Sequence, residues 1–197
     1  MLILASGSPR RAKILKDLGV AFEVVKSDAP EVSYPHDPER TVRENALAKG
    51  AAGFNTETLI PRANASCEAD ARGVRHRDGY GVLSADTIVW FDNRIYGKPR
   101  DLVEAKEYLR ELSGNIHTVF TGVAYNGEVK VVKSDVKFRE LSDAMIDEYV
   151  ARVKPTDRAG AYDIDESGDL IVESYTGSYE NIMGLPVEPL REWKIVR

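Results

Sequence analysis

Apolar residues along this chain alternate between short continuous runs and stripes with helical spacing. The runs at 2–5 (LILA) and 21–25 (AFEVV) are typical of buried strands. The stripes predict helices that begin at Pro9 and Asp101, and a third helix over about 38–52. Strands that alternate with helices in this way favour an α/β fold.

Two of these helices carry capping signals. Ser8 followed by Pro9 is typical of an N-cap and first helical position, and Gly19 ends the same helix. Asp101 with Glu104 three residues later has the pattern of a capping box. The apolar stripe expected to pack that helix on the core consists of Leu102, Ala105, Leu109 and Leu112.

The second half of the chain predicts antiparallel strands. Residues 81–90 (GVLSADTIVW) form one strand, and Asn126-Gly127 separates two further β-patterned runs, which is a strong hairpin signal. Ser142 begins another helix. Its expected core positions are Ile146, Tyr149, Val150 and Val153. Together these patterns predict a mixed, partly antiparallel sheet flanked by helices.

Length and composition predict a single domain. A chain of 197 residues can bury one sizeable core, so we expect one domain over 1–197. Residues 53–80 are polar, mix both charges and have no sustained period, which predicts a loop insertion that could be mobile.

Charge and residue usage exclude several classes of protein. A net charge of −5 argues against a general nucleic-acid binder. No apolar run reaches the length of a membrane span, and the first residues do not resemble a signal peptide. The single cysteine, Cys67, excludes an internal disulfide. We therefore expect a cytoplasmic protein that binds neither nucleic acid nor membrane.

Two arginines stand where a helix favours anions. Arg10 and Arg11 fall in the first turn of the first helix, whose N-terminus carries partial positive charge. Arg11 shares the inward face of the helix with Ile14 and Leu15. With the backbone N–H groups near Ser8, the two guanidiniums would form a phosphate cradle. The alternative is an arginine pair that reaches into solvent.

An aspartate interrupts an apolar strand. Asp86 lies within VLSADTIVW, where a lone buried carboxylate would be costly. Acids at strand ends of α/β sheets commonly face a ligand crevice. Asp86 could hold a divalent cation or accept a proton from water, and the adjacent Thr87 could contact a base or phosphate. The alternative is a strand that ends at Ser84, with Asp86 in a solvated turn.

Other polar residues give weaker signals. Glu31, Lys49 and Lys98 indicate no function when each is considered alone, since acids in loops and lysines on helices and turns are usually solvated. The three histidines lack the spacing of metal ligands, and the motifs of serine hydrolases, zinc proteases, P-loop proteins and kinases are absent.

Five motifs occur in an order that resembles the Maf family of nucleoside triphosphate pyrophosphatases. They are LASGSPRR, SADTIVW…IYGKPRD, ELSGNIHTVFTGVA, RAGAYDI and GSYENIMGLP, and together they extend over the chain apart from 53–80. The resemblance implies hydrolysis between the α and β phosphates, which releases a nucleoside monophosphate and pyrophosphate with Mg²⁺ or Mn²⁺. It also implies an α/β fold with two lobes around a central cleft and often a homodimer. Family members are thought to clear non-canonical nucleotides, or dTTP and UTP, and some are linked to septum formation.

The resemblance assigns roles residue by residue. Its catalytic aspartate falls on Asp86, which would accept a proton from water and hold the metal with Glu31. The residues that would bind the triphosphate are Ser6, Arg11, Lys49 and Lys98.

Three positions tune the choice of base in this family. Arg10 and Thr87 match the dTTP/UTP branch. The third position is usually glutamine, in GAYGIQG, whereas this chain has Asp165 in GAYDIDE. An ionised carboxylate only accepts hydrogen bonds, so this departure bears on which base is bound.

Three other functions remain open at this point. One is a non-catalytic nucleotide-binding regulator of cell division, which would not need Asp86. Another is an inosine/xanthosine triphosphate pyrophosphatase. The third is a purely structural protein, which would not need cations at a helix N-terminus.

Overall fold

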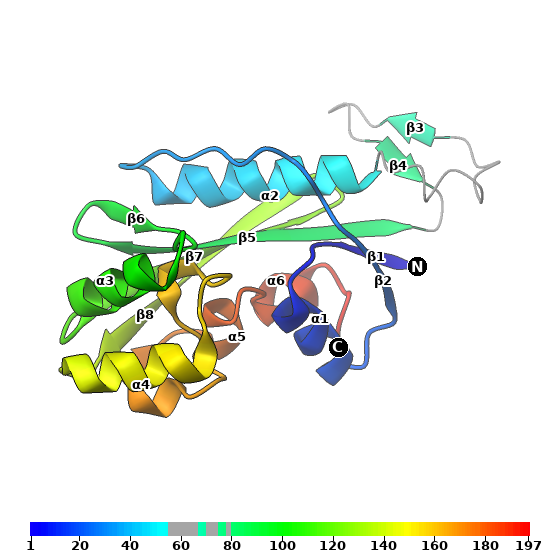
Figure 1. The fold of residues 1–197 in the computed structure, drawn as a ribbon. Helices are drawn as coiled ribbons and strands as arrows, with labels where there is room; N and C mark the ends of the chain where they lie inside the picture. The colour runs from blue at the N-terminus through cyan, green and yellow to red at the C-terminus, as the bar shows by residue number, and fades with distance from the viewer. Residues whose placement is uncertain (55–66, 70–74, 78–79) are drawn as a thin grey trace.

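The computed structural model describes residues 1–54, 67–69, 75–77 and 80–197. A seven-stranded sheet has the strand order β2-β1-β5-β7-β8-β9, and β6 also pairs with β5 (Figure 1). Its strands are β1 (Leu2–Ala5), β2 (Phe22–Val25), β5 (Gly81–Phe91), β6 (Arg94–Tyr96), β7 (Ile116–Tyr125), β8 (Glu128–Phe138) and β9 (Val172–Thr176). The helices are α1 (Pro9–Asp17), α2 (Pro38–Phe54), α3 (Leu102–Leu112), α4 (Asp143–Val153), α5 (Tyr179–Ile182) and α6 (Val187–Glu192), with 3₁₀ turns η2 (Ala159–Ala161) and η3 (Gly168–Leu170).

The sheet is mixed, which confirms the predicted α/β class. β1 pairs in parallel with both β2 and β5, whereas β5, β6, β7, β8 and β9 pair antiparallel. The hairpin predicted at Asn126-Gly127 joins β7 to β8, and both residues have the positive φ angles that a tight hairpin turn requires.

Helices cover both faces of the sheet. α2 lies across one face, and the other helices lie on the opposite face (Figure 1). Side chains of β5 pack on both layers, because neighbouring side chains of a strand point to opposite faces of the sheet. Ile88 packs with Val42 of α2, whereas Leu83 and Ala85 join the cluster that packs α1 and α6 on the sheet.

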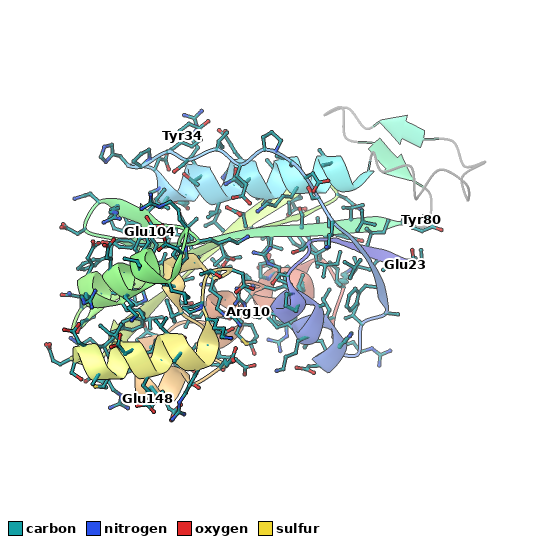
Figure 2. All side chains as sticks on the ribbon, viewed as in Figure 1. Arg10, Glu23, Tyr34, Tyr80, Glu104 and Glu148 are labelled. Atoms are coloured by element: carbon teal, nitrogen blue, oxygen red, sulfur yellow. The ribbon has the colours of Figure 1, made fainter. Side chains whose placement is uncertain are left out.

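The face opposite α2 has two apolar clusters. One joins the sheet to α3 and α4, and the other joins it to α1, α5, α6 and the last residues of the chain. All four core positions expected on α4 are buried, while Glu148 of the same helix points away from the sheet (Figure 2).

The predicted stripe of α3 needs one correction. Leu102 is 42% exposed, because it lies in the first turn beside the exposed cap Asp101, and Tyr108 joins the core instead. The Asp101 side chain accepts the expected hydrogen bonds from the backbone N–H groups of Val103 and Glu104. Glu104 accepts from the N–H of Arg100 rather than from that of the cap residue.

The segment 53–80 is only partly described. Gly53 and Phe54 complete α2, and β3 (Cys67–Ala69) pairs antiparallel with β4 (Arg75–Arg77) apart from the main sheet. The sequence pattern predicted neither this hairpin nor the continuation of α2 into the segment. Apart from Tyr80, the rest of the predicted insertion lies outside the described residues.

None of the helices in the described ranges combines the length and the apolar character that crossing a membrane requires.

Candidate active site

A gap in strand pairing lies at the middle of β5. On the edge of β5 away from β7, β1 pairs with Gly81–Leu83 and β6 pairs with Val89–Phe91. Among the described residues, no strand pairs with 84–88 along this edge. A cavity of about 750 Å³ opens here, between α2 on one face and the two apolar clusters on the other. This volume is typical of a small-ligand site.

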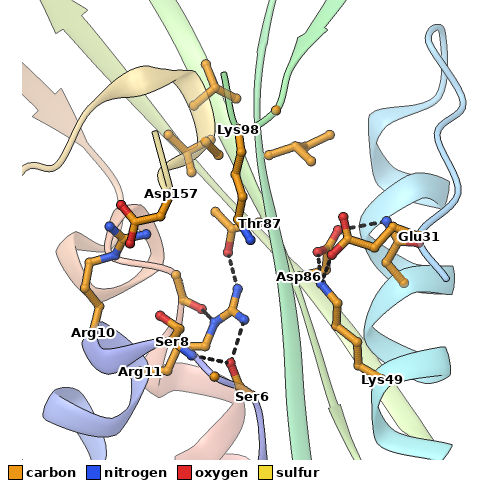
Figure 3. A pocket seen from close by; sticks show the side chains of 18 of the residues that line it. Ser6, Ser8, Arg10, Arg11, Glu31, Lys49, Asp86, Thr87, Lys98 and Asp157 are labelled. Carbon is orange, nitrogen blue, oxygen red and sulfur yellow. Dashed lines mark hydrogen bonds and ion pairs between the residues drawn. The ribbon is translucent and has the colours of Figure 1, made fainter. Parts of the chain in front are cut away.

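Asp86 and Thr87 reach into the cavity from opposite faces of β5 (Figure 3). Asp86 lies within the strand and is 6% exposed, so the alternative in which the strand ends at Ser84 is wrong. Its carboxylate accepts hydrogen bonds from Lys49 Nζ at 2.6 Å and Asn45 Nδ2 at 3.0 Å, both from α2. Asn45 had no signal in the sequence beyond its place on the inner face of the helix.

Lys49 joins two carboxylates. Its Nζ lies 2.7 Å from Glu31 Oε1 and 2.6 Å from Asp86 Oδ1. Burial by itself raises the pKa of Glu31, but Lys49, Lys98 and Arg11 together bring the pKa below its ordinary value. Glu31 is therefore ionised at neutral pH, beside Asp86.

Arg11 is fixed from three directions. Nε donates to the Gly184 carbonyl at 2.7 Å, Nη1 to Ser6 Oγ at 3.1 Å and Nη2 to Thr87 Oγ1 at 3.0 Å. All three acceptors are neutral, and burial lowers the pKa of Arg11 to about 10 although Asp86 opposes the shift. The alternative in which this arginine extends into solvent is wrong. A cation held only by neutral acceptors in a cavity is a site for an anion.

Two lysines add unpaired positive charge to the cavity lining. Lys98 follows β6, as Figure 3 shows, and Lys26 follows β2. In the described part of the chain, neither ammonium has a hydrogen-bond or ion-pair partner. Sequence reasoning missed Lys26. Its place at the carboxyl end of a parallel strand, where ligands bind in open α/β sheets, was the available signal.

Of the three positions expected to select the nucleotide base, only two lie in the cavity. Arg10 and Thr87 line the cavity, but Asp165 is absent from its lining. The Asp165 side chain is 40% exposed, lies 3.5 Å from Lys13 Nζ and accepts a hydrogen bond from the Tyr179 hydroxyl. Asp163, two residues earlier, lines the cavity instead.

Comparison with known proteins identifies the family of this chain. The family model described as "Maf-like protein" matches residues 1–193. The chain belongs to the Maf family.

Several relatives in this family are named for an enzymatic activity. A protein of Bacillus cytotoxicus named "dTTP/UTP pyrophosphatase" is 40% identical, and the match covers 98% of this chain and 93% of the relative. Proteins of the same name from Thermotoga petrophila and Thermosipho africanus are 38% and 37% identical. Those matches cover 94% and 99% of this chain, and 84% and 91% of the relatives.

The cavity of this Maf protein has a donor set that suits a hard divalent cation. Glu31 and Asp86 supply carboxylate oxygens close together, since both contact the same ammonium. The described residues contain no group of three or more acids, histidines or cysteines that could hold a metal ion. Mg²⁺ commonly binds through one or two carboxylates together with substrate phosphates, so these two residues fit that mode.

Proposed function

We propose that this Maf protein hydrolyses nucleoside triphosphates between the α and β phosphates, with dTTP and UTP as its substrates. The observation that supports this most directly is the juxtaposition of Arg11, Lys49 and Asp86 in one cavity. The names of the curated relatives supply the substrate class. The products are a nucleoside monophosphate and pyrophosphate.

Cations bind the triphosphate in this proposal. Arg11 offers the N–H groups that its three internal hydrogen bonds leave unused, and Ser6 holds its guanidinium in place. Lys98 and Lys26 supply ammonium groups that have no hydrogen-bond or ion-pair partner among the described residues. In phosphoryl transfer, positioning and electrostatic stabilisation provide most of the rate enhancement, so a site built of fixed cations suits the reaction.

Asp86 acts as the general base. Its carboxylate accepts a proton from water as the water oxygen bonds to the α-phosphorus and the bond to the bridging oxygen breaks. The displaced pyrophosphate leaves with the electron pair of that bond. Lys49 and Asn45 hold one Asp86 oxygen each, which fixes the direction of the carboxylate.

The proposal includes a divalent metal, Mg²⁺ or Mn²⁺, held by Glu31 and Asp86. When bound, such an ion neutralises phosphate charge and lowers the pKa of a nearby water. We also propose that the protein is cytoplasmic and acts as a homodimer. The alternative, a non-catalytic regulator of septum formation, would use the same phosphate-binding residues but would not need Asp86.

Pyrophosphate release from a nucleotide panel tests the proposed function. The panel contains dTTP, UTP, CTP, GTP, ITP and XTP, each with Mg²⁺, Mn²⁺ or EDTA. We expect release from dTTP and UTP with metal and none with EDTA. Asp86→Asn should lower kcat by about 100-fold or more, as is usual when a general base is lost.

Asp92→Asn is the matched control, since Asp92 is an exposed aspartate in the turn that follows the same strand. It should retain wild-type activity. A preference for ITP and XTP would favour the purine alternative. Absence of release from every nucleotide with either metal would overturn the enzymatic proposal and favour a binding regulator.

A further inference from the structure

We propose that Asp163 is a positioning residue that fixes the guanidinium of Arg10 toward the substrate, and thereby does the work expected of Asp165. This inference rests on the proposed function. Asp163 lines the cavity, and its side chain is 4% exposed. Burial of a carboxylate is costly unless it is paired, so its partners define its role.

Asp163 lies between two arginines. Its Oδ2 accepts from Arg10 Nη1 at 3.1 Å and from Arg158 Nε at 2.9 Å. Its Oδ1 accepts from the backbone N–H of Asp165 at 3.0 Å. Arg10 is a cavity-lining residue, whereas Arg158 is not. The carboxylate therefore connects the partly buried Arg158 to a side chain that lines the cavity.

Several contacts hold the support behind Asp163. Arg158 Nη2 donates to Glu166 Oε2 at 2.9 Å, and Nη1 contacts Asp157. The backbone of Asp163 is held separately, because its N–H donates to the hydroxyl of the buried Tyr149 at 2.8 Å. With both its side chain and its backbone held, Asp163 can set the position of its more exposed partner Arg10.

Arg10 needs such a partner. Among the described residues, the Arg10 guanidinium makes one hydrogen bond, to Asp163. The Arg10 side chain remains 25% exposed. Arg11 lies nearby, and its pKa is lowered mainly by burial and further by the like charge of Arg10, which repels it. A carboxylate on the far side of Arg10 offsets this repulsion. It also removes part of the ordering cost that a nucleotide would otherwise meet on binding.

The charge state of Asp163 is consistent with this role. Burial by itself raises the pKa of its carboxyl, but Arg10 and Arg158 together bring the pKa below its ordinary value. Asp163 is therefore ionised at neutral pH and pairs with Arg10 as a charge-assisted hydrogen bond.

A double-mutant cycle tests the inference. Wild type, Asp163→Asn, Arg10→Ala and the double variant are compared for kcat and KM with dTTP, and for dTTP affinity in EDTA by titration calorimetry. We expect Asp163→Asn to raise KM and weaken binding about tenfold while kcat changes by less than about twofold. In the Arg10→Ala background the same substitution should change either quantity by less than about twofold.

Two further variants separate positioning from folding. Arg158→Gln weakens the support without changing a cavity residue, so it should raise KM in the same direction, and only when Arg10 is present. Asp169→Asn changes an exposed acid elsewhere in the same loop and should leave KM unchanged.

Equal losses from Asp163→Asn in both backgrounds would overturn the inference, as would an unchanged KM. A purely structural role would lower kcat and thermal stability together and leave KM unchanged. The calorimetric arm does not depend on catalysis. If the wild type binds dTTP but releases no pyrophosphate, the proposed function fails while the role of Asp163 is still measured.

Discussion

Individual residues hold the Arg11 guanidinium in place, and one of them must be glycine. Gly184 has φ +101°, in the region that favours glycine, and its carbonyl accepts from Arg11 Nε. A Cβ at this position would lie 3.1 Å from Thr87 Oγ1 and 3.5 Å from Arg11 Nε. The same position therefore combines a backbone requirement with a steric one, directly behind the proposed phosphate ligand.

Gly184→Ala should damage both stability and substrate binding. We expect a loss of about 1–3 kcal/mol in the free energy of unfolding from backbone strain. A fall in kcat/KM of about tenfold should accompany it, because Thr87 or Arg11 must shift. Urea unfolding and initial-rate kinetics measure the two effects. Gly168→Ala is the control, since its Cβ would make only ordinary contacts of 3.5–3.9 Å. If Gly184→Ala kept full kcat/KM, Arg11 would not need its present position.

At the scale of elements, β7 buries a histidine between the sheet and the loop that contains η2. His117 is 1% exposed, its Nε2 lies 3.0 Å from the Tyr162 hydroxyl, and its ring packs edge-on against Phe138. Burial lowers the pKa of His117 to about 3. The folded protein thus keeps this ring neutral under conditions in which the unfolded chain would protonate it.

This burial should make stability depend on pH in a defined window. An unfolded histidine has a pKa of about 6.5, so the unfolded state binds the proton first as pH falls. The contribution of neutral His117 to the free energy of unfolding is complete above pH ~6.5. It is lost progressively toward pH ~3, at about 1.4 kcal/mol per pH unit.

Urea unfolding at pH 7 and pH 5 measures the slope. Between pH 7 and pH 5, His117→Gln should lose about 2 kcal/mol less of its free energy of unfolding than the wild type does. His36→Gln, at an exposed position, should keep the wild-type slope. Identical slopes for wild type and His117→Gln would show that this ring does not couple to folding.

At the scale of the whole molecule, one sheet joins the layers on its two faces. The two tryptophans lie in different layers: Trp90 packs near Phe120 on the α2 side, and Trp193 packs near Tyr125 with the cluster of α1 and α6. Each therefore reports on a different face of the same strands. A single domain over 1–197 predicts that the two faces unfold together.

Single-tryptophan variants test this prediction. Trp90→Phe leaves Trp193 as the probe of one face, and Trp193→Phe leaves Trp90 as the probe of the other. In each variant, the fluorescence midpoint in urea should coincide with the midpoint from far-UV circular dichroism. A fluorescence transition separated from the circular-dichroism transition in either variant would divide the chain into independent folding units.

The sequence by itself determined the features that depend on neighbouring residues. Asn126-Gly127 specified a hairpin, because its residues tolerate the positive φ angles of a tight turn. Ser142 specified a helix start, since its hydroxyl accepts a backbone N–H of the first turn. The arginine pair after Ser8 and the lone Asp86 in an apolar strand also stood out locally, because each violates a preference of its element.

Only the tertiary structure decided where those residues meet. The gap beside Asp86 arises because β1 and β6 pair with different halves of β5, and pairing between distant segments has no local signal. Tertiary packing also decided that Asp163, and not Asp165, lines the cavity. Side chains in an irregular loop have no period, so only the partners packed around the loop determine which carboxylate turns inward.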